Sequence, residues 1–253
     1  MRISRVLAPN PGPFTGTGTN TWVVEDAGRA VVIDPGPIDL GHEAAIAGTV
    51  EGLHVEAVIV THTHPDHAPL ANPLAKELGA PALGHAPGPE FEPDHLLGAG
   101  DLVELGEIGL MVVETPGHSD DHLCFLAGRA LFTGDHVIGG SSVLIDDFGA
   151  YLRSLAEIRQ LDLEALYPGH GEVMERPYEV IDWNLAHRLQ REAEIMHAVV
   201  AGAATAEEVL AQVYAGTDPS LLPLAARNVE AHLRKLAVEG RISYTGGRVE
   251  ALP

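Results

Sequence analysis

The sequence predicts an α/β protein that ends in a small, mostly helical C-terminal module. The chain has 253 residues and is 45% hydrophobic, which suffices for a sizeable core. Up to about residue 175, short β-branched runs alternate with helix-like stretches. After Pro177 the pattern becomes helical until a final hairpin. A mixture of paired strands and helices is typical of sheets covered by helices, so we expect that arrangement before Pro177.

The first part of the chain predicts strands and helices in alternation. Three strands over 3–7, 21–25 and 30–34 come first, the last two joined by a turn at 26–28. A helix over 39–50, a buried strand over 55–60 and a helix over 66–78 follow. Further strands are predicted at 101–105, 110–115, 122–126 and 130–133, then a helix over 150–160 and a short strand at 165–167.

The C-terminal part predicts a winged-helix-like α+β module. A long helix over 178–200 ends at a break, and Thr205 with Glu208 forms a capping box for a helix over 206–214. A helix over 224–238 and a hairpin around Gly246 and Gly247 complete the module. Residues 1–186 carry a net charge of −20 and residues 187–253 only −1. We therefore predict two domains, 1–186 and 187–253.

Composition excludes several classes of protein. The net charge of −21, from 15 Lys+Arg and 36 Asp+Glu, repels phosphate backbones, so nucleic-acid binding is disfavoured. One cysteine, Cys124, rules out an internal disulfide framework. Proline and glycine interrupt the N-terminus, and no run of 18 apolar residues occurs, which argues against a signal peptide and a membrane span. We expect a cytoplasmic protein that does not bind membranes.

The strongest chemical signal is Thr-His-Thr-His-Pro-Asp-His at 61–67, directly after the predicted strand over 55–60. Three imidazoles this close would repel one another on protonation and would need many partners if buried. A metal ion resolves both problems, since imidazole nitrogens and carboxylate oxygens are usual ligands of zinc-like cations. In an extended loop His62 and His64 point to the same side. The loop therefore predicts a metal site.

Three later residues repeat the order of strand, tight turn and ligand. His118, Asp135 and His170 each follow a glycine at the end of a predicted strand. Glycine lets the backbone approach a metal without a side chain in the way. One such histidine is weak evidence, but the three together with the loop at 61–67 indicate a site with several ligands.

The spacing His-x-His-x-Asp-His, then a distant His, Asp and His, resembles the metallo-β-lactamase superfamily. The stretches 10–13, 18–21 and 115–122 and the winged-helix-like tail more specifically resemble the β-lactamase-like protein 2 group, which is close to glyoxalase II-type hydrolases. The resemblance implies a four-layer αββα sandwich with two metal ions at the edge between its sheets.

The resemblance also implies the ligands of a dinuclear site. His62, His64 and His118 would bind the first metal, Asp66, His67 and His170 the second, and Asp135 both. Zinc is the first expectation from the ligand types, and manganese or iron also suits them. Asp66 and Asp135 are the expected catalytic carboxylates. A hydroxide bound by both metals would attack an electrophilic carbon or phosphorus.

These features predict a metal-dependent hydrolase of a small ester, thioester or lactone. One alternative is an endoribonuclease of single-stranded RNA; the charge and the mere 34 residues between Asp135 and His170, too few for an inserted nuclease domain, argue against it. A second alternative, β-lactam hydrolysis, is disfavoured because no export signal is apparent. A binding module with a vestigial site is disfavoured because all seven ligands are present.

Other residues carry weaker predictions. His136 either lines the substrate pocket or, as the neighbour of Asp135 in an extended chain, faces away. Asp120, Asp121 and His122 either orient His118 by hydrogen bonds or form a plain turn. We interpret Cys124 as a small core residue.

The cationic residues of the tail allow two interpretations. Arg227, Arg234, Lys235, Arg241 and Arg248 would suit nucleic acid, but nearby glutamates dilute their charge. We favour a module that covers the active-site mouth or supports a homodimer, with a small molecule as substrate.

Overall fold

The computed structural model describes residues 1–139 and 143–252. The chain forms two compact units, which we call the sheet unit and the helical unit. The sheet unit comprises Met1–Pro116, Asp121–Val143 and Gln160–Tyr178, and the helical unit Gly117–Asp120, Leu144–Arg159 and Glu179–Pro253. The boundary that we predicted between residues 186 and 187 lies within the long helix α4 (Pro177–Val200) and stays a prediction.

The first sheet of the sheet unit has six strands in sequence order. They are β1 (Arg2–Leu7), β2 (Asn20–Asp26), β3 (Arg29–Ile33), β4 (His54–Ile59), β5 (Ala82–Gly84) and β6 (His95–Leu96). β1, β2 and β3 are antiparallel, as the turn between the predicted strands required. From β3 to β6 the pairing is parallel. The carboxyl ends of β3 and β4 therefore reach the same edge of the sheet.

The second sheet has five strands in the order β11-β10-β9-β8-β7. They are β7 (Leu102–Leu105), β8 (Ile108–Glu114), β9 (Leu123–Ala127), β10 (Ala130–Gly134) and β11 (Ala165–Pro168). β7 to β10 form an antiparallel meander, whereas β10 and β11 are parallel neighbours. The turns after β10 and β11 are thereby brought to one edge.

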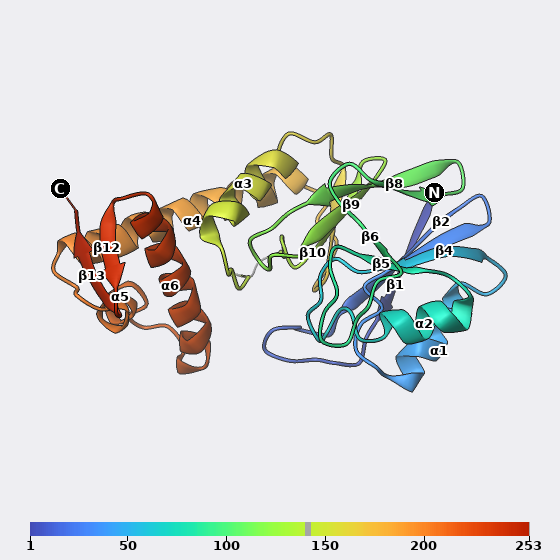
Figure 1. Cartoon of the computed structure of the whole chain (residues 1–253), viewed down its shortest axis with the longest axis horizontal. Coiled ribbons are helices and arrows are strands. Elements are labelled where there is room, and N and C mark those ends of the chain that lie inside the picture. The colour runs from blue at the N-terminus through green and yellow to red at the C-terminus, as the bar shows by residue number, and fades with distance from the viewer. Residues whose placement is uncertain (140–142, 253) are drawn as a thin grey trace. The chain divides into compact units, whose positions relative to one another are not determined.

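The two sheets pack face to face through a shared apolar core. Val31 and Ile59 of the first sheet and Leu110 and Phe125 of the second belong to one buried cluster. Because successive strand residues face opposite sides, Val32 instead joins a second cluster with the helices α1 (Leu40–Thr49) and α2 (Ala71–Leu78). Helix, sheet and sheet thus form successive layers in this unit (Figure 1).

The helical unit contains α3 (Phe148–Ile158), most of α4, and a C-terminal group of short elements. This group consists of α5 (Ala206–Val213), a 3₁₀ turn at Pro219–Leu221, α6 (Leu222–Val238) and the hairpin β12 (Ile242–Thr245) and β13 (Arg248–Ala251). One apolar cluster joins α4, α5, α6 and the hairpin. Thr205 caps α5 as predicted, accepting from Glu208 N at 3.2 Å. The predicted order of helix, helix and hairpin is confirmed.

One predicted helix begins later than expected, and two strands were not predicted. The helix predicted over 66–78 begins only at Ala71, because residues 64–70 form turns closed by the amides of His67 and Ala68 on the carbonyl of His64. Asp66 and His67 therefore come from a turn. The strands β5 and β6 were not predicted, since three and two residues are too short to show a period.

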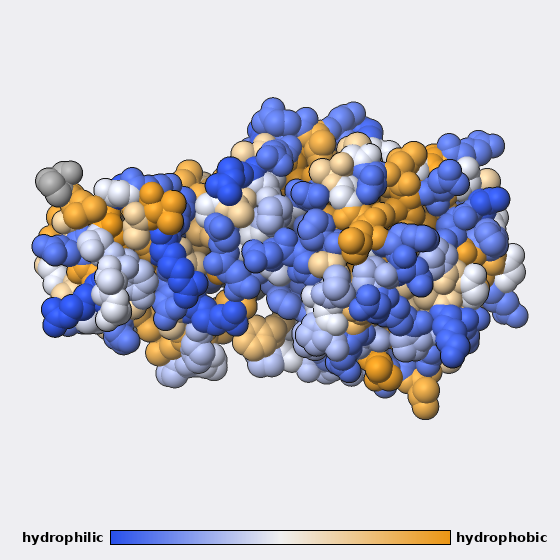
Figure 2. All heavy atoms as spheres, viewed as in Figure 1, coloured by the Kyte–Doolittle hydropathy of each residue, from blue (hydrophilic) through white to orange (hydrophobic). Residues whose placement is uncertain are grey.

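Hydrophilic side chains cover most of the face shown in Figure 2, and apolar atoms gather where β8 lies in Figure 1. Leu96 and Leu102 are exposed on β6 and β7, the edge strands of the two sheets. Among the described residues, no helix has the length and apolar character that a membrane crossing requires.

Candidate active site

The predicted ligands lie on turns that follow the carboxyl ends of strands. The loop with His62, His64 and His67 follows β4, Asp135 follows β10, and His170 follows β11. The amide of Leu123 donates to Thr61 O at 2.7 Å, which ties the start of β9 to the end of β4. Parallel pairing of β10 with β11 brings the other two turns together, with Gly169 N donating to Gly134 O at 2.8 Å.

The seven predicted ligands gather in two clusters, in each of which the ligand atoms lie within 4.8 Å of one another. We call them the three-histidine cluster and the mixed cluster. The first consists of His62, His64 and His118, and the second of Asp66, His67, Asp135 and His170. The structure groups Asp135 with the mixed cluster. Its predicted bridging role, like the individual ligand roles, stays a prediction.

In the mixed cluster, imidazole nitrogens and carboxylate oxygens converge in a buried space. His170 Nε2 lies 3.1 Å from Asp66 Oδ2 and 3.3 Å from Asp135 Oδ1. His67 Nε2 lies 3.4 Å from both Asp135 Oδ1 and His170 Nε2. His67 is fully buried, and the side chain of Asp66 is 28% exposed. Solvent therefore reaches this cluster from the Asp66 side.

The charges of the mixed cluster favour a cation. Burial lowers the pKa of His67, but the carboxylates of Asp135 and Asp34 outweigh it and hold that pKa well above its usual value. Burial likewise opposes protonation of His170, yet hydrogen bonds to Asp135 and Asp66 raise its pKa to about 9. The cluster thus retains protons at neutral pH. A divalent cation would replace these protons, so the residues fit a metal.

The three-histidine cluster also favours a cation. His62 Nε2 and His64 Nδ1 lie 2.9 Å apart, close enough that a proton or a cation must lie between their lone pairs. His118 Nδ1 lies 2.7 Å from the carbonyl oxygen of Leu144. A carbonyl only accepts, so Nδ1 carries the proton and Nε2 keeps its lone pair. This is the form of imidazole that binds a metal.

Asp34 orients His67, a role that the sequence did not indicate. Asp34 Oδ1 accepts from Thr61 N at 2.7 Å, and Oδ2 accepts from Thr61 Oγ1 at 2.8 Å and faces His67 Nδ1 at 2.9 Å. Its φ of +51° is uncommon for a residue other than glycine. The strand pattern indicates Asp34 only as the last residue of a strand. A carboxylate after four apolar residues and before Pro35 was the available signal.

Asn20 holds the turn that carries His170. Its side-chain Nδ2 donates to Pro168 O at 3.0 Å and to Gly171 O at 2.9 Å, and its backbone amide donates to Gly169 O. A Cβ on Gly169 would lie 2.6 Å from His67 Cε1 and 2.7 Å from Asp135 Oδ1, so this glycine permits the close approach that we expected. A residue of the segment at 18–21 thus supports the turn of a candidate ligand.

The residues with weaker predictions lie near the clusters. Asp121 Oδ2 accepts from Thr63 N at 2.9 Å, and His122 Nε2 accepts from Asp135 N at 3.2 Å, so both orient segments that carry ligands. Asp120 is exposed. His136 has no exposed surface, with its ring 5.7 Å from that of His122. Its role in a substrate pocket stays a prediction.

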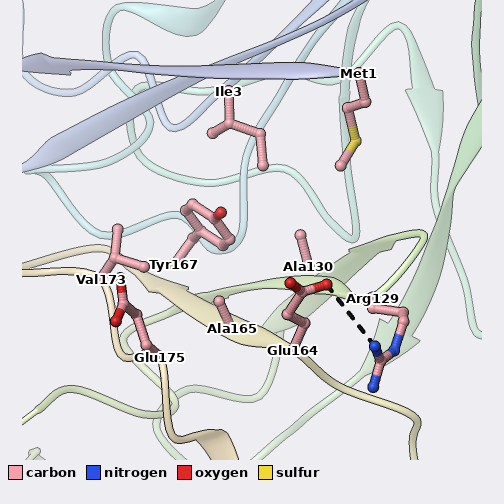
Figure 3. Close-up of a pocket in the computed structure, with 9 residues that line it drawn as sticks. All are labelled: Met1, Ile3, Arg129, Ala130, Glu164, Ala165, Tyr167, Val173 and Glu175. Atoms are coloured by element: carbon pink, nitrogen blue, oxygen red, sulfur yellow. Dashed lines mark ion pairs between the residues drawn. The ribbon is translucent and has the colours of Figure 1, made fainter.

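A separate cavity of about 600 Å³ lies at the other end of the second sheet. Figure 3 shows its lining, with the ion pair of Arg129 and Glu164 at 3.8 Å. Ala130 and Ala165, which also line it, begin β10 and β11, whereas Asp135 and His170 follow the ends of these strands. Strands of this length span roughly 13–17 Å. The cavity is therefore distinct from the candidate site.

Comparison with known proteins agrees with this arrangement. A family model described as the metallo-beta-lactamase superfamily matches residues 14–170, and one described as a beta-lactamase associated winged helix domain matches residues 205–248. The chain is 31% identical to the beta-lactamase-like protein 2 homolog of Drosophila melanogaster, over 95% of this chain and 89% of that protein. It is 29% identical to an atrochrysone carboxyl ACP thioesterase of Passalora fulva, over 96% and 78% respectively.

A solved structure shows the same fold. The crystal structure of a metallo-beta-lactamase family protein from Thermus thermophilus matches 99% of this chain and 98% of its own, with a TM-score of 0.82 at 20% identity. The predicted αββα sandwich with a C-terminal winged-helix domain is thereby confirmed. From the fold, the two clusters and the family match together, the chain belongs to the metallo-β-lactamase superfamily of hydrolases.

Proposed function

We propose that this metallo-hydrolase cleaves a small acyl compound, an ester, thioester or lactone, with a thioester as the first candidate. The observation that carries the proposal is that imidazoles and carboxylates gather in two neighbouring clusters, in which the rings of His62 and His67 lie 4.3 Å apart. The Passalora fulva relative, which is named a thioesterase and matches nearly the whole chain, supports the choice of substrate.

Two divalent cations, zinc first and manganese or iron next, would occupy the clusters. His62, His64 and His118 would hold one and Asp66, His67 and His170 the other, and Asp135 would serve both. When bound, such cations supply a nucleophile from water at neutral pH and polarise the acyl carbonyl.

The chain's own residues prepare the site for this chemistry. Asp34 and the Leu144 carbonyl hold protons on Nδ1 of His67 and His118, so that both Nε2 atoms remain available. Asp66 has the more exposed of the two carboxylates, 28% against 13% for Asp135. We assign to the Asp66 carboxylate the task of taking the proton lost by the attacking water and delivering it to the departing sulfur or oxygen.

The ion pairs of the C-terminal module favour acyl substrates over RNA. Lys235 and Arg241 both contact the buried carboxylate of Glu192, at 2.7 and 2.8 Å. Arg234 pairs with Glu230 at 2.7 Å, and Arg227 with Asp146 at 3.2 Å. Cations neutralised in this way gain little from phosphate contacts. This supports the view that the module does not form a nucleic-acid site.

The proposal is tested by loading the purified chain with zinc or manganese and assaying an acyl thioester, a lactone, a β-lactam and labelled single-stranded RNA. Metal content is measured on the same samples. We expect thioester hydrolysis that the Asp135→Ala variant lacks. RNA cleavage that depends on Asp135, with all three acyl substrates inert, would instead identify an endoribonuclease.

A further inference from the structure

A closed path of hydrogen bonds runs beneath the turn that carries Asp135. Asp135 N lies 3.2 Å from His122 Nε2, and His122 Nδ1 lies 2.8 Å from Thr115 Oγ1. Thr115 Oγ1 lies 3.3 Å from Cys124 Sγ, which lies 3.8 Å from the carbonyl oxygen of Thr133. The path thus leaves the turn at residue 135 and returns to it at residue 133.

The two ends of the path determine which group donates and which accepts in each hydrogen bond. A backbone amide only donates, so Asp135 N–H donates to His122 Nε2, and the ring must carry its proton on Nδ1. That N–H donates to Thr115 Oγ1, whose own proton goes to Cys124 Sγ at 3.3 Å, which is nearer than the second acceptor, the carbonyl oxygen of His122 at 3.5 Å. The thiol then donates to the Thr133 carbonyl, which only accepts. Every group in the path has one role, provided that His122 is neutral and protonated on Nδ1.

The surroundings of the path support these roles. Burial raises the pKa of the Cys124 thiol to about 12, so it keeps the proton that it donates. Thr115, His122 and Cys124 are all almost completely buried, where a hydrogen bond competes with no solvent. A Cβ on Gly134 would lie 2.8 Å from His122 Nε2, which shows how closely the ring packs against the turn.

We propose that His122 is a positioning residue for Asp135, and that Thr115 and Cys124 complete the path through which it acts. The path holds the backbone of the turn at both ends and so fixes the direction in which the Asp135 carboxylate leaves it. This inference rests on the proposed function, because it gives Asp135 its role at the metals. It assigns a task to Cys124, which the sequence had indicated only as a core residue.

The tautomer of His122 is measured on metal-free protein by ¹⁵N NMR of the imidazole nitrogens. The His122→Gln spectrum identifies the signals among the 14 histidines. We expect a neutral ring with the proton on Nδ1. A proton on Nε2 would abolish the hydrogen bond from Asp135 N, because two donors would then face each other, and would reverse the one to Thr115 Oγ1. That result would overturn the proposal, whatever the enzyme hydrolyses.

A pair of variants then tests how His122 acts. Glutamine places its amide oxygen where Nε2 lies and can still accept from Asp135 N, whereas asparagine reaches only the Nδ1 position. We expect His122→Asn to weaken binding of Zn²⁺ at least about tenfold in chelator competition. His122→Gln should recover most of this loss. Equal affinities for wild type and His122→Asn, with the fold intact, would contradict the proposal.

Two controls separate positioning from loss of stability. Val24→Ala removes buried volume from an apolar cluster that does not include Cys124, and it should leave Zn²⁺ affinity unchanged. Cys124→Ser keeps a donor and should bind Zn²⁺ better than Cys124→Ala. If Val24→Ala weakened binding as much as His122→Asn, the effect would be structural and the proposal wrong. Because these readouts are tautomer and affinity, a wrong substrate assignment leaves them intact.

Discussion

The imidazole Nδ1 of His67 lies 2.9 Å from Oδ2 of Asp34, and both side chains are almost completely buried. The contact fixes the proton of His67 on Nδ1 and leaves Nε2 facing Asp135 and His170. A carboxylate that accepts from one ring nitrogen of a histidine orients the ring and raises the basicity of the other nitrogen, which can bind a metal. The relationship yields a specific prediction about the tautomer of His67.

Asp34→Asn should weaken metal binding about 10- to 100-fold while the fold persists. Asparagine tolerates the positive φ and can still accept from Thr61 N through its oxygen. Its amide nitrogen, however, would donate to His67 Nδ1 and force the proton onto Nε2. Metal affinity by chelator competition and far-UV circular dichroism check this. Wild-type affinity in a folded Asp34→Asn protein would show that Asp34 does not set the tautomer.

Asp135→Ala should abolish turnover and reduce the metal content without unfolding the protein. Asp135 contributes Oδ1 to the mixed cluster, 3.3–3.4 Å from two imidazoles, but it lies outside both apolar cores. Turnover, metal content and thermal unfolding are measured on one preparation. A metal-loaded variant that turns over at the wild-type rate would remove Asp135 from the mechanism.

Gly117→Ala should destabilise the protein by more than about 3 kcal/mol, from backbone strain and overlap together. Its φ is +136°, and a Cβ would lie 2.4 Å from Tyr151 Cα. Gly128→Ala is the matched control, because φ there is +61° and no atom lies within 4 Å of the added Cβ. Gly128→Ala should lower the free energy of unfolding by about 1–2 kcal/mol. Urea unfolding compares the two, and equal losses would show that the Tyr151 contact is unimportant.

Glu192 should make stability depend on pH in the acid range. Contact with His232 and ion pairing with Lys235 lower its pKa from 4.5 to about 2, against the effect of burial. A carboxylate whose pKa is lower in the folded than in the unfolded chain stabilises the fold at pH values above its unfolded pKa. This stabilisation is lost progressively as the pH falls below about 4.5. By pH 3 the loss should reach about 2 kcal/mol.

Glu192→Gln is the control for this prediction, because the other carboxylates titrate equally in both proteins. Urea unfolding at pH 6 and pH 3 should show a smaller loss for the variant than for wild type. Parallel losses in the two proteins would mean that Glu192 does not titrate with a lowered pKa.

Many of the helices and strands, and the types of the candidate ligands, could be predicted from the sequence. The alternation of strands and helices, the N-cap at Thr205 and the hairpin at 246–247 depend on neighbouring residues, and the structure contains them. The predicted capping box is present in part, because the Glu208 carboxylate accepts from Ala204 N and not from Thr205 N. The seven candidate ligands stand beside turn residues at strand ends, so their types and spacing were visible before their positions were known.

Tertiary structure alone decided which side chains orient these ligands. Asp34 meets His67 across 33 positions and Asn20 meets Pro168 across 148, and neither pair has a local pattern. The sequence left His122 either as a partner of His118 or as part of a plain turn, and in the structure its ring accepts from Asp135 N. Hydrogen bonds depend on a few ångströms and on direction, and these are set only when parallel pairing and sheet packing bring distant strand ends together.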